Sequence, residues 1–528
     1  MSKRSISIIL LLLGSLAVYG EISSIDFPTA RWFFSTSRDV PLLNWKAEGV
    51  EFLWFGWLSS TIMVAVGLCL LVSSFRSGPP NPVTMRRIKR FKEIKRGYYS
   101  LIILMGLVGL AALDQLVVGK EALAVRYEGK WEFPAFNPKP FIGSQFGIEG
   151  ERADAPVNYR KLKIAFKEAG EGGKVIMPLI PYGSTDDTLP PRSRSLVLKD
   201  GVYQEDGSNS PYYGLAAKYY DVVEGTFHLR YTLRNGMLSG AVDGWNEAGD
   251  SVYTAEYLKG VKLIEKEKYS GEGDVKDFLG AEDVQLRAVK YPPSPPIPEE
   301  RNWLGTTSQS YDVLAYLYGG LQVNFKAALI FLPIVYTVGI VIGMLMGYLG
   351  GWFDLLMDRI IEIFSNMPYL FVVIILSSMV PEQFKGLPII LAILILFGWM
   401  GITSLMRTAA YRDKERDYIA ASRVLGAGTT RIIFRHLLPN TVAIIVTLVP
   451  FTVSALVFSL TALDYLGFGL PPEYATWGRL LNDGLSNLSA PWLVSSTFVV
   501  LVGLLILITF IGEAVREAFD PKKYSYYR

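Results

Sequence analysis

Cysteine and histidine, two residue types that often carry covalent or metal chemistry, are scarce in this 528-residue sequence. The one cysteine, Cys69, lies inside an apolar run, where a free thiol usually serves as a small buried residue, and it cannot form an intrachain disulfide. With only two histidines, His228 and His436, we expect no histidine-based metal site. The GxxxxGK[ST] pattern that cradles ATP phosphates does not occur. We therefore predict no catalytic residue, cofactor or metal in this chain.

The most informative polar segment is residues 417–440, which read DYIAASRVLGAGTTRIIFRHLLPN. We expect a helix over about 412–425 that ends at Gly426, because glycine readily adopts the left-handed conformation just past a helix end. A second short helix is expected over 429–438, stopped by Pro439, since proline disrupts a helix interior.

Two short helices joined by a glycine would form a knob on the cytoplasmic side. Ala420 and Ala421 keep the first helix slim, so that it can enter a groove on a partner protein. Apolar residues of the second helix would hold it against the membrane domain, namely Ile432, Ile433, Leu437 and Leu438. The alternative is an ordinary amphipathic loop.

Composition indicates that this knob belongs to a polytopic membrane protein. Half of the residues are hydrophobic and 19% are charged, whereas a soluble domain carries about 25% charge. Most apolar segments have about 20 residues or more, enough to cross a hydrocarbon core of about 30 Å. The eight predicted spans are 6–20, 52–74, 98–118, 322–348, 359–381, 386–406, 441–463 and 493–515.

The first apolar segment is short and follows Lys3 and Arg4. Two interpretations stay open: the core of a signal peptide cleaved before Glu21, or an uncleaved signal anchor, which we favour.

Basic residues set the expected orientation, because they are enriched in cytoplasmic loops. Residues 85–96 hold seven basic residues and one acidic residue, and residues 407–435 hold seven and three. With the basic tail after Val515, these segments are expected in the cytoplasm, which puts residues 119–320 outside. The run at 85–96 is interpreted as a topology anchor that attracts anionic membrane lipid, and not as a nucleic-acid site.

The external insertion is soluble in character and ends in a proline-rich linker at 292–298. Alternating Tyr, Thr, Val and Leu between 201 and 268 predict β-hairpins, and Asn235-Gly236 is a strong hairpin turn. Residues 225–265 resemble MORN-like hairpin repeats; the alternative is an ordinary antiparallel sheet.

The knob resembles the EAA loop of ABC-type importer permeases, which docks into a nucleotide-binding subunit. The pattern is an acid, two alanines, a glycine and a leucine-proline pair. In this chain the matching positions, which the resemblance assigns to the ATPase-coupling loop at 412–440, are Asp417, Ala420, Ala421, Gly426, Leu438 and Pro439. Asp417 stands where glutamate is usual.

Further motifs over most of 299–521 are similar to dipeptide and oligopeptide permeases. Asn302-Trp-Leu-Gly-Thr306 resembles the segment before the second core span, although Thr307 replaces the usual aspartate and Tyr311 the usual arginine. The ending at 512–521, together with 123–134, is most similar to the "E"-type permease subunit of microcin C transporters.

This resemblance implies an all-α polytopic fold: a type I importer core of six spans, with two extra N-terminal spans and an inserted extracytoplasmic β-rich (α+β) domain. The expected regions are 1–84, the extra spans; 85–118, the basic segment and first core span; 119–298, the insertion; 299–515, the permease domain; and 516–528, a cytoplasmic tail.

The implied function is the permease subunit of an ATP-driven importer for peptides or peptide-like compounds, with microcin C-like compounds as one candidate, in the bacterial inner membrane. Its implied partners are a second permease, two P-loop nucleotide-binding subunits that hold the ATP, and an external solute-binding protein. The chain itself would not be an enzyme.

Two rival functions stay open: a subunit of an ABC exporter or extraction complex, and a membrane-anchored receptor whose external domain does the work. The scarcity of ionisable residues deep in the spans argues against a proton-coupled carrier. Gly339, Gly343 and Gly347 recur every four residues, which favours close helix packing, with a hinge as the alternative.

Overall fold

A computed structural model describes most of the chain. The described residues are 3–39, 45–47, 50–76, 82–148, 154–169, 173–186, 192–199, 201–205, 210–221, 226–246, 249–263, 266–271, 274–279, 286–290, 292–298 and 301–519. The chain divides into two compact units: Met1–Asp186 with Val313–Arg528, here called the membrane unit, and Asp187–Asp312, here called the sheet unit.

Apolar helices of spanning length make up most of the membrane unit. In the described part of the chain, six segments are long and apolar enough to cross a membrane, and two bent helix pairs raise the total to eight if each pair is one span. The six contain α1 (Lys3–Ser23), α3 (Trp54–Arg76), α8 (Val313–Leu349), α11 (Leu387–Gly398) with α12 (Met400–Asp413), α14 (Thr429–Ile432) with α15 (Leu438–Tyr465), and α17 (Pro491–Phe519). The bent pairs are α4 (Pro82–Glu93) with α5 (Lys95–Ala112), and α9 (Gly351–Ser365) with α10 (Tyr369–Met379). Each of the eight predicted apolar segments overlaps one of these, and their orientation stays a prediction.

Both bent pairs differ from the straight spans that hydropathy alone predicts. The segment expected at 359–381 breaks between α9 and α10 with a bend of 83°. Pro368 is the N-cap of α10, and proline disfavours helical geometry at the residue before it. The basic run forms its own helix, α4, at 95° to α5. The first core span was expected over 98–118 and is shorter, because α5 ends at Ala112.

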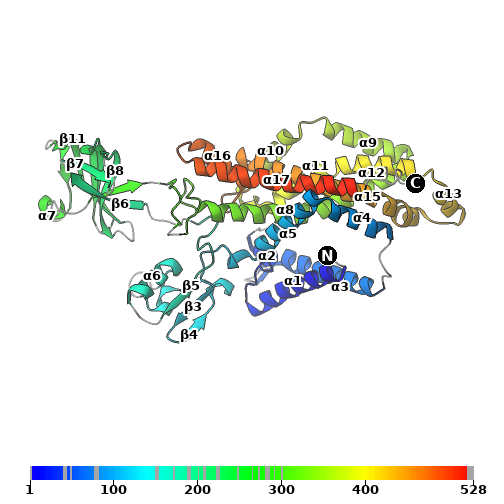
Figure 1. Ribbon diagram of the computed structural model, residues 1–528, viewed down its shortest axis with the longest axis horizontal. Helices are drawn as coiled ribbons and strands as arrows, with labels where there is room; N and C mark the ends of the chain where they lie inside the picture. Colours follow the sequence, from blue (N-terminus) through cyan, green and yellow to red (C-terminus); the bar gives the residue numbers. More distant parts are fainter. Residues whose placement is uncertain are drawn as a thin grey trace. The chain divides into compact units, whose positions relative to one another are not determined.

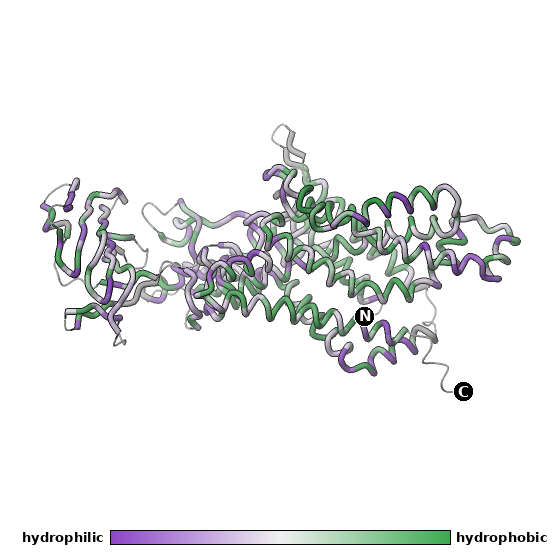
Figure 2. The backbone as a smooth tube through the Cα atoms, turned by 90° about the horizontal axis from the view of Figure 1, so that it is seen from above, coloured by the Kyte–Doolittle hydropathy of each residue, from purple (hydrophilic) through white to green (hydrophobic). Residues whose placement is uncertain are grey.

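Close helix contact in the bundle depends on the glycines of α8. A Cβ at Gly343 would lie 2.5 Å from the Thr403 carbonyl oxygen, and one at Gly347 would lie 2.5 Å from the Arg407 carbonyl oxygen. Only glycine lets the two backbones approach so closely, which confirms the predicted packing role. Figure 1 shows α8, α12, α15 and α17 running along one another, and Figure 2 shows hydrophobic residues distributed along these helices.

The two extra N-terminal helices pack as a pair. A Cβ at Gly14 of α1 would lie 2.7 Å from Val64 of α3, and one at Gly67 of α3 would lie 2.9 Å from Leu11. Between them lie α2 (Trp32–Asp39) and the short strands β1 (Trp45–Ala47) and β2 (Val50–Phe52). The structure does not test whether the first segment is cleaved.

The first part of the external insertion belongs to the membrane unit. Strands β3 (Ala124–Tyr127), β4 (Lys130–Glu132) and β5 (Lys174–Ile176) form a three-stranded antiparallel sheet in the order β4-β3-β5. Helix α6 (Tyr159–Ala169) covers it, and Val125, Phe146, Tyr159, Leu162 and Val175 are among the residues of its core. Helix α16 (Trp477–Ser486) lies between α15 and α17 in the chain.

The sheet unit holds a nine-stranded antiparallel sheet in the order β12-β11-β10-β9-β8-β14-β6-β7, with β13 paired to β11. A five-residue helix, α7 (Val275–Leu279), accompanies it. The strands are β6 (Arg192–Lys199), β7 (Val202–Glu205), β8 (Gly214–Asp221), β9 (Thr226–Arg234), β10 (Met237–Trp245), β11 (Ser251–Leu258), β12 (Val261–Lys262), β13 (Lys268–Tyr269) and β14 (Arg287–Lys290). A β-rich insertion is therefore present, whereas its MORN-like character stays a prediction; residues 225, 247–248 and 264–265 of that stretch lie outside the described residues.

The hairpin turn between β9 and β10 follows the sequence prediction. Asn235 and Gly236 both have positive φ, at 51° and 72°, which is the requirement of a type I′ turn. Arg234 pairs with Met237 across it, so the predicted hairpin is confirmed.

Candidate functional site

The first helix of the knob, α13 (Asp417–Val424), is shorter than expected. It was predicted from about residue 412, but the chain turns between Asp413 and Arg416. Asp413 is buried. Its carboxylate accepts a hydrogen bond from Arg412 Nε at 3.0 Å and forms an ion pair with Arg416, whose Nε also lies at 3.0 Å. Two guanidinium groups gathered on one buried carboxylate stabilise a tight turn there, so that α13 becomes a separate helix.

Gly426 ends α13 as the sequence predicts. Its φ is +79°, its N–H donates to Arg423 O at 2.9 Å, and the N–H of Ala427 donates to Ser422 O at 3.0 Å. These two bonds are those of the Schellman motif, which satisfies carbonyl groups left over at a helix end. The glycine elbow of the knob is therefore confirmed.

The second helix does not stop at Pro439, and the prediction of a stop was wrong. A π-helical turn over Ile433–Leu437 joins α14 to α15, and the helix continues to Tyr465. Pro439 stands in the first turn of α15, where the missing N–H of proline is tolerated. The wider π turn lets the chain pass the proline while remaining helical. The knob is thus continuous with a spanning helix.

Apolar contacts hold the knob against the bundle. The side chains of Ile419, Ile432, Ile433 and Leu437 are each at most 2% exposed and belong to the same buried cluster as residues of α8 and α12. Burying an aliphatic side chain contributes about 1.5–3 kcal/mol, so four of them fix the knob firmly. This confirms the predicted anchoring role of the second helix.

The tip of the knob is exposed. Val424 and Leu425 are 88% and 86% exposed, more than any other large hydrophobic side chain among the described residues. The alanine pair, the acid and the glycine of the knob are exposed as well, namely Asp417, Ala420, Ala421 and Gly426. Leu438 is partly buried and Pro439 exposed at the base of the knob. An exposed apolar tip on a rigid base is the surface expected of a docking element.

Ion pairs at the base of the knob were missed by the sequence analysis. Arg407 of α12 donates from Nε to Asp354 Oδ1 at 2.6 Å and from Nη1 to Asp358 Oδ1 at 2.7 Å, which ties α12 to α9. Tyr411 also donates to Asp354. Arg407 lies 53 residues beyond Asp354 along the chain, too far for any local pattern to indicate the pair.

Helix α13 also touches the C-terminal end of α8. The Arg423 guanidinium lies 5.2 Å from the centre of the Tyr348 ring, and Arg423 Nε lies 3.4 Å from the Tyr348 hydroxyl. On the other side, Asn440 donates to the Tyr418 hydroxyl at 2.9 Å. The helix is therefore held from both sides, while Val424 and Leu425 at its tip stay exposed.

Comparison with known proteins shows the family of this chain. Residues 339–524 match the family model described as "Binding-protein-dependent transport system inner membrane component". The chain is 33% identical over 443 residues to the inner membrane ABC transporter permease protein YejE of Escherichia coli, a match that covers 84% of this chain and 98% of that protein. This chain belongs to the ABC peptide importer permeases. The family is a membrane component of transporters and not an enzyme, and these permeases work with ATPase and substrate-binding components.

Other relatives are similar to a smaller part of the permease. A peptidoglycan transport system permease protein YejE of Agrobacterium fabrum is 41% identical over 222 residues, which is 42% of this chain and 58% of that protein. The dipeptide transport system permease protein DppC of Bacillus subtilis is 32% identical over 249 residues, which is 46% of this chain and 76% of that protein. With its apolar spans, the permease is a multi-pass inner-membrane protein.

Several residues of the motif before α8 are buried, including Thr307, one of the two that depart from the family pattern. Asn302 donates to Asp312 Oδ2 at 2.7 Å and to Gly305 O at 3.0 Å, and Asn302 and Asp312 have no exposed surface. The two departing residues still pair, because the Tyr311 N–H donates to Thr307 Oγ1 at 3.1 Å and the Thr307 N–H to Tyr311 O at 2.9 Å. One backbone bond and one bond to the Thr307 hydroxyl therefore close this turn without the usual aspartate and arginine.

Proposed function

We propose that this permease couples ATP hydrolysis in partner subunits to alternating access of a peptide path. The observation that carries the proposal is the exposed tip of the knob, with Val424 and Leu425 presented on the rigid base of α13. Two P-loop subunits bind the ATP, and the grooves of these subunits receive α13 and its counterpart on a second permease. The coupling residues are those of the EAA pattern: Asp417, Ala420, Ala421, Gly426, Leu438 and Pro439.

Energy source and direction are tested in inside-out and right-side-out membrane vesicles that contain the assembled transporter. We expect a labelled peptide to accumulate on the cytoplasmic side only with ATP and with the solute-binding protein, and a protonophore to leave accumulation unchanged. Accumulation driven by a proton gradient, or movement outward without a binding protein, would contradict the proposal.

The proposed substrates are peptides or peptide-like compounds, and two lines of support name different candidates. The Agrobacterium relative carries peptidoglycan transport in its name, which supports a peptide released from peptidoglycan. The resemblance at 123–134 and 512–521 supports a microcin C-like compound. Competition against uptake of a labelled peptide decides between them: the true substrate class competes at the lower concentration, and competition by neither would exclude both.

We also propose that the sheet unit helps to dock the solute-binding protein, since the unit is predicted to lie on the outer side. A deletion of the predicted hairpins alone, residues 201–268, would cut through the sheet, because β6 and β14 would remain. Arg192 of β6 and Lys290 of β14 are paired across the sheet, so residues 193–289 can be excised and the two ends joined by a short Gly-Ser linker. We expect the excised permease to assemble but to bind the solute-binding protein more weakly. Unchanged affinity and uptake would refute this role.

A further inference from the structure

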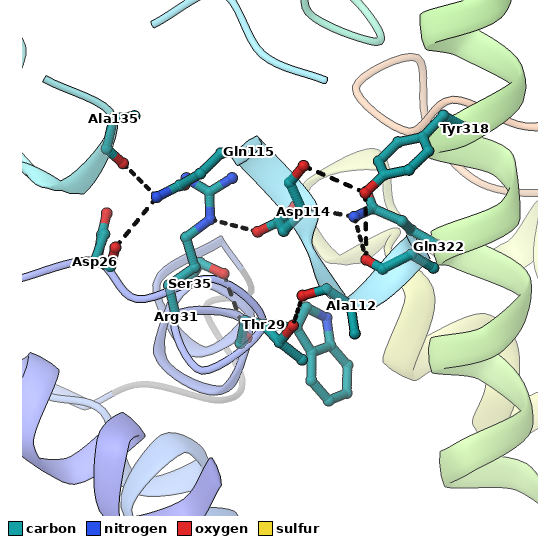
Figure 3. Close-up of polar contacts among 12 residues, drawn as sticks. Asp26, Thr29, Arg31, Ser35, Ala112, Asp114, Gln115, Ala135, Tyr318 and Gln322 are labelled. Carbon is teal, nitrogen blue, oxygen red and sulfur yellow. Dashed lines mark hydrogen bonds and ion pairs between the residues drawn. The ribbon is translucent and has the colours of Figure 1, made fainter. Parts of the chain in front are cut away.

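A cluster of polar side chains lies at the outer end of α5, and nothing above gives it a role. Its centre is Asp114, in a short 3₁₀ turn (Asp114–Leu116) directly after α5. Arg31 Nε donates to Asp114 Oδ2 at 2.9 Å, and Gln322 Nε2 of α8 donates to Asp114 Oδ1 at 2.9 Å. Figure 3 shows Asp114 between Arg31 on one side and Gln322 on the other. One carboxylate thus joins the segment between α1 and α2 to α8 of the permease core.

The last carbonyl groups of α5 are satisfied from the same two directions. A helix end leaves four carbonyl groups without an intrahelical partner. Tyr318 of α8 donates to Leu110 O at 2.8 Å, Gln322 donates to Ala111 O at 3.0 Å, and Thr29 donates to Ala112 O. The end of α5 is therefore capped jointly by α8 and by the segment between α1 and α2.

Further contacts fasten the segment between α1 and α2. Gln115 is only 4% exposed, and its Nε2 donates to Asp26 O at 3.2 Å and to Ala135 O. The Asp26 N–H donates to Phe136 O at 2.9 Å. Burial keeps most competing water away from these hydrogen bonds, so each contributes more to stability than a bond at the surface.

Four charged side chains around this cluster form two ion pairs. Arg31, Asp114, Lys120 and Asp186 line a cavity of about 240 Å³, in which Lys120 Nζ lies 3.0 Å from Asp186 Oδ1. Arg31 pairs with Asp114 and Lys120 with Asp186, so these side chains connect segments that lie far apart in the chain. Connection is the function that the geometry supports.

Helix α8 links this cluster to the knob. It has 37 residues, about 55 Å at 1.5 Å per residue, and carries Tyr318 and Gln322 near one end and Tyr348 near the other. Tyr348 contacts Arg423 of α13. A displacement of α13 therefore acts directly on the helix whose outer end is held by Asp114.

We propose that Arg31, Asp114 and Gln322 form an outer clasp that holds the outer end of α8 to the extra N-terminal helices during transport. The clasp makes α1 and α3 a working part of the permease, and Asp114 is a positioning residue that does not touch the substrate. The proposal rests on the ATP-driven transport proposed above.

The test compares Arg31→Gln, Asp114→Asn and the double variant in the assembled transporter. Asparagine is the chosen replacement because Asp114 has φ of +46°, a conformation that asparagine tolerates. The control is Lys385→Gln, which breaks the external Lys385–Glu382 pair of the same unit without touching the clasp. We expect each clasp variant to lower the maximal uptake rate about fivefold, with membrane abundance and KM unchanged, and Lys385→Gln to match the normal protein.

The double variant shows whether the two residues act together. If they form one clasp, it is no slower than the slower single variant, whereas independent effects would multiply. Uptake at the normal rate in both single variants, or multiplied effects in the double variant, would overturn the proposal. So would a loss of abundance that accounts for the whole loss of uptake.

A crosslinking measurement separates failure of the clasp from failure of the transport proposal. Lys326 Nζ of α8 lies 5.6 Å from the centre of the Trp32 ring in α2. Trp32→benzoylphenylalanine should photo-crosslink to α8 in the full-length protein, and adding Asp114→Asn should reduce the yield, whether or not the preparation transports. An unchanged crosslinking yield would refute the clasp even if ATP drives uptake. If the yield falls but ATP drives no uptake, only the transport role is refuted.

Discussion

Gly426 and Gly428 are two residues apart in the knob, and the backbone makes different demands on them. Neither glycine has a neighbour within 4 Å of a Cβ position, but only Gly426 has positive φ, at +79°. Gly428 has φ of −68°, which any residue can adopt. Any difference between substitutions at the two positions therefore reports the backbone conformation and not crowding.

Gly426→Ala should lower ATP-dependent uptake, whereas Gly428→Ala should leave it nearly unchanged. A Cβ in the left-handed region costs about 1–2 kcal/mol, which loosens the end of α13. Uptake and amide hydrogen exchange of α13 measure the effect. Equal behaviour of the two variants would mean that the elbow does not shape the coupling helix.

The exposed tip leads to a second prediction at this scale. Leu425→Asp should weaken binding of the ATPase subunit at least about tenfold, because one buried leucine contributes about 1.5–3 kcal/mol to an apolar contact. Leu488→Asp is the matched control: Leu488 is 77% exposed in the turn before α17, on the predicted outer side. Titration of the purified ATPase onto the detergent-solubilised permease measures both. A similar affinity for both variants would show that the tip is not the docking surface.

Single residues were predictable where the chemistry is local. The left-handed glycine and the apolar face of the second helix follow from short-range patterns, and both are confirmed at Gly426 and at Ile432. The pairing of Arg407 with Asp354 was not predictable, because the two residues lie on different helices and meet only when α12 packs near α9.

At the scale of helices, the glycines of α8 set how closely the bundle packs. Gly343 faces the backbone of α12 at 2.5 Å from a Cβ position, whereas Gly503 of α17 has nothing within 4 Å. Both lie inside helices, where alanine is intrinsically favoured over glycine by about 1 kcal/mol. Packing and propensity therefore act in opposite directions at Gly343 and in the same direction at Gly503.

Gly343→Ala should lower the melting temperature of the detergent-solubilised permease, and Gly503→Ala should hold or raise it. The added methyl group at residue 343 must push α8 away from α12, which sacrifices dispersion contacts along both helices. Tryptophan fluorescence during heating follows the transition. A stabilised Gly343→Ala variant would mean that the two helices are not in tight contact.

The spans themselves were predictable, since hydropathy over about 20 residues depends on composition and not on tertiary contacts. Bends were not. The break before Pro368 has a local signal, the proline itself, which hydropathy does not register. The π turn that carries the chain past Pro439 has no such signal.

At the scale of the whole molecule, the insertion predicted as a single domain is shared between two units. Its first part, with β3, β4 and β5, belongs to the membrane unit, and the large sheet belongs to the other. The sequence could not show this division, because β14 pairs with β6 almost a hundred residues earlier in the chain. The attachment of the N-terminal helices through Asp114 was hidden for the same reason, since its partners come from segments 83 and 208 residues away.

The measurement that tests the coupling role most directly is co-purification from the native membrane in mild detergent. The tagged permease and a Gly426→Arg variant are purified side by side, and the co-eluting proteins are identified by mass spectrometry. We predict that the normal chain brings down a P-loop ATPase and a second permease, and that Gly426→Arg loses the ATPase while keeping the second permease. If the normal chain brings down no ATPase in several detergents, or if Gly426→Arg retains it in full, the knob is not the site at which ATP hydrolysis reaches this permease.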